Sequence, residues 1–422
     1  MEWQLSSEER GYLRGLAKKQ AEYAALPIMG ERKKMWYELN DGRGGTRVPM
    51  IVETWTFDRD FMPESIFRCA PGLARGIERQ LLRNIRNHEL LDDDKVMPDY
   101  FPTHWFMEVD EFGVKIEAKY IADSEGVDIG HEFIHPIKDL SRDLELLKPA
   151  VCKVDREKSF RYRDFIRELF DGILDVRIEG GLGGYSMLTQ RVVKLMGMEA
   201  YFMAMLEEPE KMHQLMAFLR DNCLRIWKWL EQEKLLRANH ANHQSFGSSY
   251  NFTTRLNTPT DLDTPVGLSD IFGASNSQET VGLSAAMYHE FCFPYYRDVA
   301  EPLGLLYYGC CEPVHPFWED VVRYPHLKKV SISRWCDEGF VGERLRGTDI
   351  VFSRKPDPNF LGADQVLRED AWRSHIAATL RAAQGVQLEI LVRDVYTVHG
   401  NLGKPRRAIE IAREEIAKAG RG

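Results

Sequence analysis

Four short apolar runs in the last third of the chain constrain the fold more than any other feature. They cover residues 303–308, 328–332, 349–352 and 387–392, and each ends in a polar cluster: GCCEP, SRWCD, SRKPDP and RDVYT. Segments with helical spacing separate most of them. Strands that alternate with helices predict a parallel sheet with right-handed crossovers. The pattern therefore predicts an α/β fold.

Two architectures fit this pattern, a (β/α)8 barrel and a doubly wound sheet. Both place functional side chains at the carboxyl ends of the strands. We favour the barrel, because all four clusters carry reactive groups and a ring of strand ends would gather them around one centre. The length of 422 residues would also suit two or three average domains.

Other segments predict further helices and strands. Residues 6–9 have the spacing of a capping box at the start of a helix. Residues 47–54 and 175–179 have the composition of strands, and residues 112–121 that of a hairpin. From Pro209 onward, Met, Leu and Trp residues recur at helical spacing. Such a stripe is more typical of a buried core face than of a cofactor groove.

The charge balance bears on the partners that the chain can have. A total of 56 Lys and Arg residues against 65 Asp and Glu residues gives a formal net charge of −9. This balance argues against nucleic acid, because phosphate binding needs a concentrated basic face. No apolar run reaches 18 residues and the first residues are charged, so we expect no membrane span and no secretory signal. We expect a cytoplasmic protein, whose seven cysteines are thiols or metal ligands rather than a disulfide framework.

Residues 131–135 read His-Glu-Phe-Ile-His, which matches the H-E-x-x-H motif of zinc metalloproteases. The motif binds zinc through two imidazoles one helical turn apart, so it needs a helix. Pro136 follows His135 at once and disfavours helical geometry at that residue. A metalloprotease is therefore the weakest of the functional alternatives.

The stretch GGLGG at residues 180–184 follows a predicted strand. Backbone N–H groups in such a turn can cradle a phosphate. The stretch matches neither G-x-G-x-x-G nor the P-loop pattern, since no Lys-Ser or Lys-Thr follows it. We favour a tight turn with positive φ angles, and such a turn can still line the mouth of a site.

Cys310 and Cys311 stand together at the end of a predicted strand, which is an unusual placement for two thiols. Thiolates are good zinc ligands, and a catalytic zinc takes three protein ligands and keeps one position open. Neighbouring side chains seldom both reach one ion, so further ligands would come from other strand ends. The candidates are Cys336, Asp337, Asp394, His240 and His243. Two small buried residues would give the same pattern.

Charged residues also follow the last three predicted strands. They are Arg334, Asp337, Lys355, Asp357, Arg393 and Asp394. Exposed loop ion pairs would give the same composition. Their repeated position after apolar runs favours several of them pointing into one cavity. His240 and His243 precede a Ser-rich and aromatic segment, which favours a role in a pocket as acid, base or orienting groups. A polar loop outside any site would have the same composition.

Five stretches of the chain resemble the uroporphyrinogen decarboxylase superfamily on its methyltransferase-like branch. They are residues 197–219, 275–296, 307–339, 349–361 and 388–415, and they include the phrases YGCCEP and SRKPDP. The resemblance implies one distorted (β/α)8 barrel domain over residues 1–422, with an N-terminal helical extension over residues 1–45. Dimers occur in the superfamily, so a homodimer is the oligomer that the resemblance suggests.

The superfamily contains two chemistries. Its decarboxylases act on a tetrapyrrole without a metal and grip the substrate with arginines after the first strand. Here Glu53 and Asp58 follow that strand, and the first arginine after the strand is Arg59, so this activity is the less favoured one. The other branch is similar to zinc-dependent methyltransferases, which exchange methyl groups between a small substrate and a corrinoid carried on a separate protein.

The best-known methyltransferases of this branch bind zinc through His-x-Cys at one strand end and a cysteine near the C-terminus. Here Tyr308 takes the place of the histidine and Cys310 matches the first cysteine. The position of the last cysteine falls near Asp394. The resemblance therefore implies an altered ligand set, built from Cys310 or Cys311, Glu312 and an acid or thiol at 336–337 or 394.

The leading hypothesis is a methyltransferase that moves a methyl group from a small methylated substrate to a protein-bound corrinoid, assisted by zinc. Methyl ethers are the substrates we expect first, because aromatic residues are frequent near the predicted loops. The expected zinc ligands are Cys310, Cys311 and Cys336. The expected catalytic residues are Glu312, Asp337, Asp394, His240 and His243. The expected substrate-binding residues are Trp55, Tyr308, Trp335 and Lys355.

Two alternatives from other classes remain open. A metal-free decarboxylase or lyase would grip a small carboxylate with Arg334, Lys355 and Arg393. A non-catalytic ligand-binding barrel would explain why the usual zinc ligands are altered.

Overall fold

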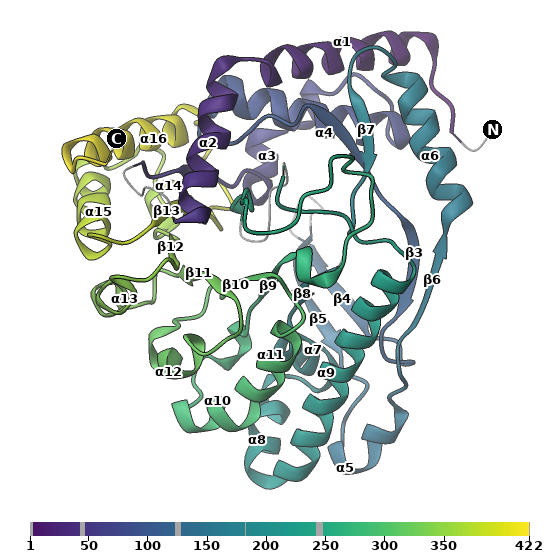
Figure 1. Cartoon of the computed structure of the whole chain (residues 1–422), viewed down its shortest axis with the longest axis vertical. Helices are drawn as coiled ribbons and strands as arrows, with labels where there is room; N and C mark the ends of the chain where they lie inside the picture. Colours follow the sequence, from purple (N-terminus) through teal and green to yellow (C-terminus); the bar gives the residue numbers. More distant parts are fainter. Residues whose placement is uncertain (1–2, 43–46, 123–127, 182, 242–247, 422) are drawn as a thin grey trace.

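A parallel sheet of seven strands forms the centre of the computed structural model, which describes residues 3–42, 47–122, 128–181, 183–241 and 248–421. The strand order is β1-β13-β12-β11-β10-β9-β8, and all neighbours run parallel. The strands are β1 Met50–Val52, β8 Tyr185–Ser186, β9 Phe272–Ser275, β10 Leu305–Tyr308, β11 Leu327–Ile332, β12 Val351–Arg354 and β13 Leu388–Val392. The α/β class is therefore confirmed (Figure 1).

The four apolar runs of the last third form the four neighbouring strands β10 to β13. Their registers place the carboxyl ends of the strands at similar heights along the sheet, since Tyr308 pairs with Val330 and Ile332 pairs with Arg354. At the far end of the sheet, Val52 of β1 pairs with Val392 of β13. The polar clusters that follow these strands therefore meet at one edge of the sheet, as the sequence predicted.

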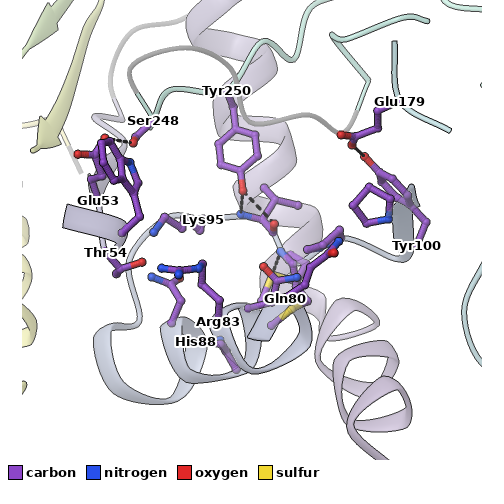
Figure 2. A pocket seen from close by; sticks show the side chains of 18 residues that line it. Glu53, Thr54, Gln80, Arg83, His88, Lys95, Tyr100, Glu179, Ser248 and Tyr250 are labelled. Atoms are coloured by element: carbon purple, nitrogen blue, oxygen red, sulfur yellow. Dashed lines mark hydrogen bonds between the residues drawn. The ribbon is translucent and has the colours of Figure 1, made fainter. Parts of the chain in front are cut away.

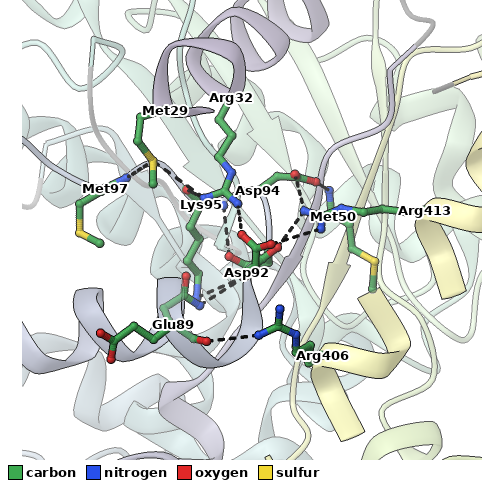
Figure 3. A network of polar contacts seen from close by, with 12 residues as sticks. Met29, Arg32, Met50, Glu89, Asp92, Asp94, Lys95, Met97, Arg406 and Arg413 are labelled. Atoms are coloured by element: carbon green, nitrogen blue, oxygen red, sulfur yellow. Dashed lines mark hydrogen bonds and ion pairs between the residues drawn. The ribbon is translucent and has the colours of Figure 1, made fainter. Parts of the chain in front are cut away.

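The sheet does not close, and the closed eight-stranded barrel is not confirmed in the part of the chain that the structure describes. Strands β2 (Tyr100–Thr103) and β7 (Asp175–Ile178) form a separate parallel pair. The free edge of β1 is occupied by side chains, because Asp94 Oδ2 accepts from Met50 N at 2.8 Å and Asp93 Oδ2 from Val52 N at 3.0 Å. Arg413 in turn donates to Asp94 at 3.0 Å (Figure 3). Carboxylates thus satisfy N–H groups that a neighbouring strand would otherwise bind.

Helices flank the sheet and its loops (Figure 1). They are α1 Ser7–Ala24, α2 Pro27–Asp41, α3 Asp58–Phe61, α4 Leu73–Arg86, α5 Leu140–Asp143, α6 Arg156–Leu169, α7 Leu188–Met196, α8 Met198–Glu207, α9 Pro209–Gln232, α10 Ala285–Phe291, α11 Phe293–Ala300, α12 Trp318–Val321, α13 Glu338–Leu345, α14 Asn359–Gly362, α15 Glu369–Ala382 and α16 Gly403–Lys418. None of the described helices has the length and apolarity that crossing a membrane requires.

The predicted helical stripe after Pro209 is the buried face of α9. Its apolar residues Met212, Leu215, Leu219 and Trp227 are all buried in the main core. The core interpretation of this stripe is therefore confirmed. Burying such side chains contributes about 2 kcal/mol each, and α9 packs through them against α7, α8 and α11.

Two helices precede the first strand. The capping box at the start of α1 is present, since Ser6 Oγ accepts from Glu9 N at 3.1 Å and Glu9 Oε2 accepts from Ser6 N at 3.0 Å. Helix α1 packs on α4. Helix α2 buries Trp36 completely against Ile51 and Leu391 of the sheet. This tryptophan belongs to the core of the sheet, so α2 is held by apolar packing.

The H-E-x-x-H motif lies on a strand. Residues 131–134 belong to β5 (Asp128–Ile134), which pairs with β4 (Glu117–Ala122) in an antiparallel hairpin. His131 and Glu132 are exposed, and His135 Nδ1 lies 3.0 Å from the backbone oxygen of Lys194. A second hairpin-like pair joins β3 (Phe106–Asp110) to β6 (Val151–Asp155). Without the helix the zincin geometry is absent, so the metalloprotease alternative is wrong.

Candidate active site

A cavity of about 560 Å³ opens at the carboxyl edge of the parallel sheet. Its walls are the segments that follow β1, β8, β9, β10 and β13. Its lining residues are Glu53, Trp55, Tyr185, Met187, Gln190, Ser248, Asn276, Gln278, Cys310, Cys311, Arg393, Asp394 and Tyr396. The clusters GCCEP and RDVYT therefore meet here, as predicted from their position after strands.

The vicinal thiols form the floor of this cavity. Cys310 Sγ lies 3.6 Å from Cys311 Sγ and 3.7 Å from Arg393 Nη1. Cys311 Sγ lies 3.6 Å from Asp394 Oδ2. The Cys311 thiol, Lys355 and Arg393 together lower the pKa of Cys310 to about 5, whereas the hydrogen bond to Cys310 raises the pKa of Cys311. Cys310 is therefore the thiolate of the pair at neutral pH.

Arg393 is held in place by a buried carboxylate. Arg393 Nε donates to Glu53 Oε2 at 2.7 Å, and Ser248 Oγ donates to the same oxygen at 2.8 Å. Glu53 is 2% exposed and Arg393 9% exposed, so water screens this ion pair little. Glu53 Oε1 is buried and accepts no hydrogen bond from any described group. The geometry thus fixes one cation between Glu53 and Cys310.

Lys355 lies beneath the thiols. Its Nζ donates to the backbone oxygen of Cys310 at 3.1 Å, and the side chain is buried. Burial by itself would lower the pKa of Lys355, but Tyr307 and the Cys310 thiolate raise it. The lysine was predicted to bind substrate, yet it is not among the residues that line the cavity. Its charge acts on the site through Cys310.

Glu312 ties two loops together behind the cavity. One carboxylate oxygen accepts from Cys310 N at 2.8 Å and the other from Ser277 N at 2.9 Å. Burial, followed by the charge of Cys310, raises the pKa of Glu312 to about 7. The side chain is 1% exposed and does not line the cavity, so its visible role is to position the turn that carries the thiols.

Two predicted residues after β11 lie away from the thiols. Cys336 Sγ lies 3.3 Å from Val314 N and 3.7 Å from Ser333 Oγ. Asp337 caps α13, where its carboxylate accepts from Phe340 N at 2.9 Å. Neither residue lines the cavity. The predicted set of Cys310, Cys311 and Cys336 is therefore not brought together by the fold.

Three further predicted residues have other surroundings. Trp335 is 62% exposed, with Arg334 over its ring at 4.3 Å. The Tyr308 hydroxyl lies 2.6 Å from Ser277 Oγ within a buried group of tyrosines, so it faces away from the cavity. His240 is fully buried, with Nε2 2.8 Å from Thr258 Oγ1. His243 lies outside the described residues.

Three side chains at the cavity carry donor atoms that suit a metal ion. Cys310, Cys311 and Asp394 form a chain of contacts, and two thiols with a carboxylate are a suitable donor set for zinc. Among the residues that the structure describes, however, no group of three or more His, Cys, Asp or Glu side chains is arranged to hold an ion. These three donors would have to converge further on binding a metal.

Sequence reasoning missed the aromatic rim and the importance of Glu53. Trp55 was predicted, but Tyr185 and Tyr396 were not, and Trp55 and Tyr396 are 60% and 71% exposed at the cavity mouth. Asp394 and Tyr396 have φ angles of 58° and 60°, which non-glycine residues seldom adopt. A signal for Glu53 was available, because it lies at the end of the strand predicted over residues 47–54 and directly follows β1.

Gly180, Gly181 and Gly183 of the GGLGG stretch line a different cavity, beside β7. Gly181 and Gly184 have φ angles of 64° and 80°. A Cβ on Gly180 would lie 2.5 Å from Arg237 N, so a side chain does not fit there. The tight-turn interpretation is therefore confirmed.

Comparisons with known proteins give a likeness of fold. No family model and no curated protein matches the chain. Among solved structures, a methyltransferase from Methanosarcina mazei superposes with a TM-score of 0.51 at 13% sequence identity, covering 91% of this chain and 98% of that chain. At that identity the likeness concerns the fold alone. The chain is thus similar in fold, over nearly its whole length, to a methyltransferase.

Proposed function

We propose that the chain is a methyltransferase that moves a methyl group from a small methylated substrate to a corrinoid carried by a separate protein. The observation that carries the proposal is the Cys310 sulfur beside the Arg393 guanidinium, at the floor of a cavity at the carboxyl edge of a parallel sheet. Functional groups of α/β enzymes lie at this edge. The fold of the methyltransferase described above agrees with this assignment.

Methyl ethers remain the substrate class that we propose. Trp55, Tyr185 and Tyr396 line the cavity together with Met187, and these side chains offer flat apolar surface for a small aromatic ring. The rim is open to solvent at Trp55 and Tyr396. A partner protein that carries a large planar cofactor has access to the substrate from this side.

The charged groups of the cavity suit the departure of a methyl group from oxygen. When the carbon–oxygen bond breaks, the electron pair stays on oxygen, which becomes an anion. Arg393, held by Glu53, places a fixed cation at the cavity, and a fixed cation stabilises such an anion more than mobile water does. The corrinoid would supply the nucleophile that takes the methyl carbon.

The proposal includes one site for the zinc that the sequence predicts. Cys310, Cys311 and Asp394 are the residues that would hold it, and it would act as a Lewis acid on the ether oxygen. Because these donors are not arranged around one point, the steps above are assigned to the chain's own side chains.

The test is a methyl-transfer assay with free cob(I)alamin as the acceptor and a panel of aromatic methyl ethers as donors. We expect the absorbance change of cobalt methylation with at least one donor, and a loss of about 100-fold or more in Cys310→Ser and Cys311→Ser. Cys336→Ser is the matched control, because Cys336 is a partly buried thiol outside the cavity. Full activity in both cavity variants would refute the proposal.

The carboxylate lyase has less support. Of its three proposed cations, Arg393 alone lines the cavity. Arg334 pairs with Asp357 at 2.7 Å outside it, and the buried Lys355 donates to the backbone oxygen of Cys310. Carbon dioxide release from a panel of small acids without any corrinoid would favour it instead.

A further inference from the structure

A second cavity, of about 240 Å³, lies against the candidate active site. It fills the open seam between β1 and β2 and is bounded on its outer side by α4. Glu53, Trp55 and Ser248 line both cavities, so the two spaces share a wall at the carboxyl end of β1. The two cavities are therefore neighbours at this wall.

Two cations line this second cavity. Arg83 of α4 and Lys95, which lies beside β1, are on the same side of it (Figure 2). Lys95 Nζ donates to the backbone oxygen of Val52 at 2.8 Å and lies 3.8 Å from Asp93. Arg83 pairs through Nη2 with Asp58 at 2.8 Å. Burial lowers the pKa of Lys95, the charges of Asp93 and Glu53 raise it, and the Arg83 charge lowers it.

Arg83 has unused binding capacity. Its Nη1 is buried and has no hydrogen-bond partner among the described groups. A buried, unpaired donor on a charged group is costly, and a carboxylate is the partner that a guanidinium binds best. His88 also lines the cavity, and burial lowers its pKa, so it adds no charge at neutral pH.

The acidic groups of this cavity are already engaged. Glu53 is bound to Arg393 and Ser248, as described above, and Glu179 accepts from the Tyr100 hydroxyl at 2.8 Å. In Figure 2, Glu179 and Tyr100 lie at the opposite end of the cavity from Thr54. The end near Arg83 and Lys95 holds the two cations that line the cavity, Arg83 in an ion pair with Asp58 and Lys95 with Asp93.

We propose that the seam cavity binds the carboxylate of the substrate at Arg83 and Lys95, so that the preferred substrates are small methylated carboxylic acids. The methylated end then lies over Cys310, and the acid end lies in the seam. The inference rests on the proposed function for the role of Cys310, whereas the anion site stands on its own geometry. The acid group would supply the specificity that an aromatic rim alone does not provide.

The test is binding, measured by calorimetry on the full-length protein without any corrinoid. The probes are 4-methoxybenzoate, its neutral analogue 4-methoxybenzamide, and inorganic phosphate. We expect the benzoate to bind at least tenfold more tightly than the benzamide, and Arg83→Gln and Lys95→Met each to weaken the benzoate tenfold or more while leaving the benzamide unchanged. These factors correspond to the loss of one charge-assisted hydrogen bond.

Arg79→Gln is the matched control. Arg79 lies one turn earlier on α4 and also pairs with Asp58, at 3.0 Å, but it does not line the cavity. We expect it to bind 4-methoxybenzoate like the wild type, and thermal unfolding of each variant checks that it is folded. Equal weakening in Arg79→Gln, or unchanged binding in Arg83→Gln, would overturn the proposal.

The remaining outcomes separate this inference from the proposed function. Tight, Arg83-dependent binding of phosphate without binding of the benzoate would overturn the substrate-carboxylate assignment in favour of a free anion. Arg83-dependent binding of the benzoate supports the anion site even if no methyl group is transferred to cob(I)alamin. In that case the proposed function fails and the carboxylate site does not.

Discussion

The Arg393 guanidinium bridges Glu53 and Cys310, two residues that follow strands far apart in the sequence. Its Nε lies 2.7 Å from Glu53 Oε2 and its Nη1 lies 3.7 Å from Cys310 Sγ. A carboxylate fixes the cation, and the cation in turn favours the thiolate. The charge of Cys310 therefore depends on Glu53, which follows β1, and on Arg393, which follows β13.

The charge state of Cys310 is the most direct consequence. The neighbouring groups lower its pKa to about 5, whereas burial raises the pKa of Cys69, Cys223, Cys292 and Cys336. A lowered pKa means that the thiolate is present above pH 5 and is lost as the pH falls through that value. Metal-free protein should therefore show one thiolate at pH 7 by its absorbance near 240 nm, with a midpoint near pH 5.

Two variants test whether Arg393 lowers the midpoint of the Cys310 titration. Arg393→Gln removes the cation and should move the midpoint upward by at least about one pH unit. Arg334→Gln removes a cation that pairs with Asp357 outside the cavity and should leave it unchanged. A midpoint that stays near pH 5 in Arg393→Gln would contradict the bridging role.

Loss of the Glu53 charge should destabilise the fold. Glu53→Gln leaves Arg393 buried without its carboxylate, and breaking a buried pair on one side costs about 3 kcal/mol. We expect a lower free energy of unfolding in urea. Glu64→Gln, which removes an exposed partner of Arg75, should change it by less than about 0.5 kcal/mol. Equal effects of the two substitutions would show that burial of the Glu53 pair does not matter.

Functional side chains follow the carboxyl ends of parallel strands, and this strand-end rule explains which site residues could be predicted from the sequence and which could not. Cys310, Cys311 and Asp394 were predicted at the site because they directly follow apolar runs, and the structure places them together. Cys336 also follows a strand, but it lies on the turn into α13. The rule gives the edge of the sheet where a residue lies and does not give the direction of its side chain.

Alternation along a strand limits the prediction for Tyr308 in the same way. Neighbouring residues of a strand point to opposite faces. Tyr307 lies 2.8 Å from Ser353 on one face, whereas Tyr308 joins the buried tyrosines on the other. The sequence predicts that the two faces differ, but only the packing decides which face is turned to the site.

That the sheet stays open at β1 could not be predicted from the sequence, for a related reason. The edge of β1 is satisfied by Asp93 and Asp94, which lie about 40 residues further along the chain. A carboxylate that accepts from a strand N–H group leaves no periodic signature in the sequence. The seam that this leaves is also the place of the second cavity.

Glu312 should give the stability of the protein a measurable pH dependence. Its pKa is raised to about 7 in the folded chain, against about 4.3 for an unfolded glutamate. Between these values the folded state keeps a proton that the unfolded state has lost. The Glu312 contribution to stability therefore falls as the pH rises from about 4.3 to 7, by on the order of 4 kcal/mol in total, whereas the Cys310 thiolate contributes stability that grows as the pH rises above about 5.

The Glu312→Gln variant isolates this contribution. It should lose the Glu312 contribution, so that its stability increases relative to the wild type between pH 5 and 7. It should also unfold more easily at pH 5, because a Gln side chain accepts only one of the two backbone N–H groups of Cys310 and Ser277. Urea unfolding at several pH values gives both quantities. A wild-type slope that persists in Glu312→Gln would assign the pH dependence to another group.

Removal of the metal should abolish the activity without unfolding the protein. We propose that zinc binds at Cys310, Cys311 and Asp394, and these residues supply only three donors at the surface of a core that is packed without them. A structural zinc with four ligands stabilises a fold by about 10 kcal/mol or more, because such a fold depends on it. Here we expect dialysis against EDTA to abolish methyl transfer with little change in the unfolding midpoint, and added zinc to restore activity.

Metal content measured by mass spectrometry assigns the ligands. We expect about one zinc per chain in wild-type protein and in Cys336→Ser, and none in the Cys310→Ser, Cys311→Ser double variant. Zinc that survives the double substitution would place the metal elsewhere. Loss of zinc in Cys336→Ser would instead mean that the loop after β11 moves toward the cavity on binding the metal, because Cys336 now packs against Val314 and Ser333.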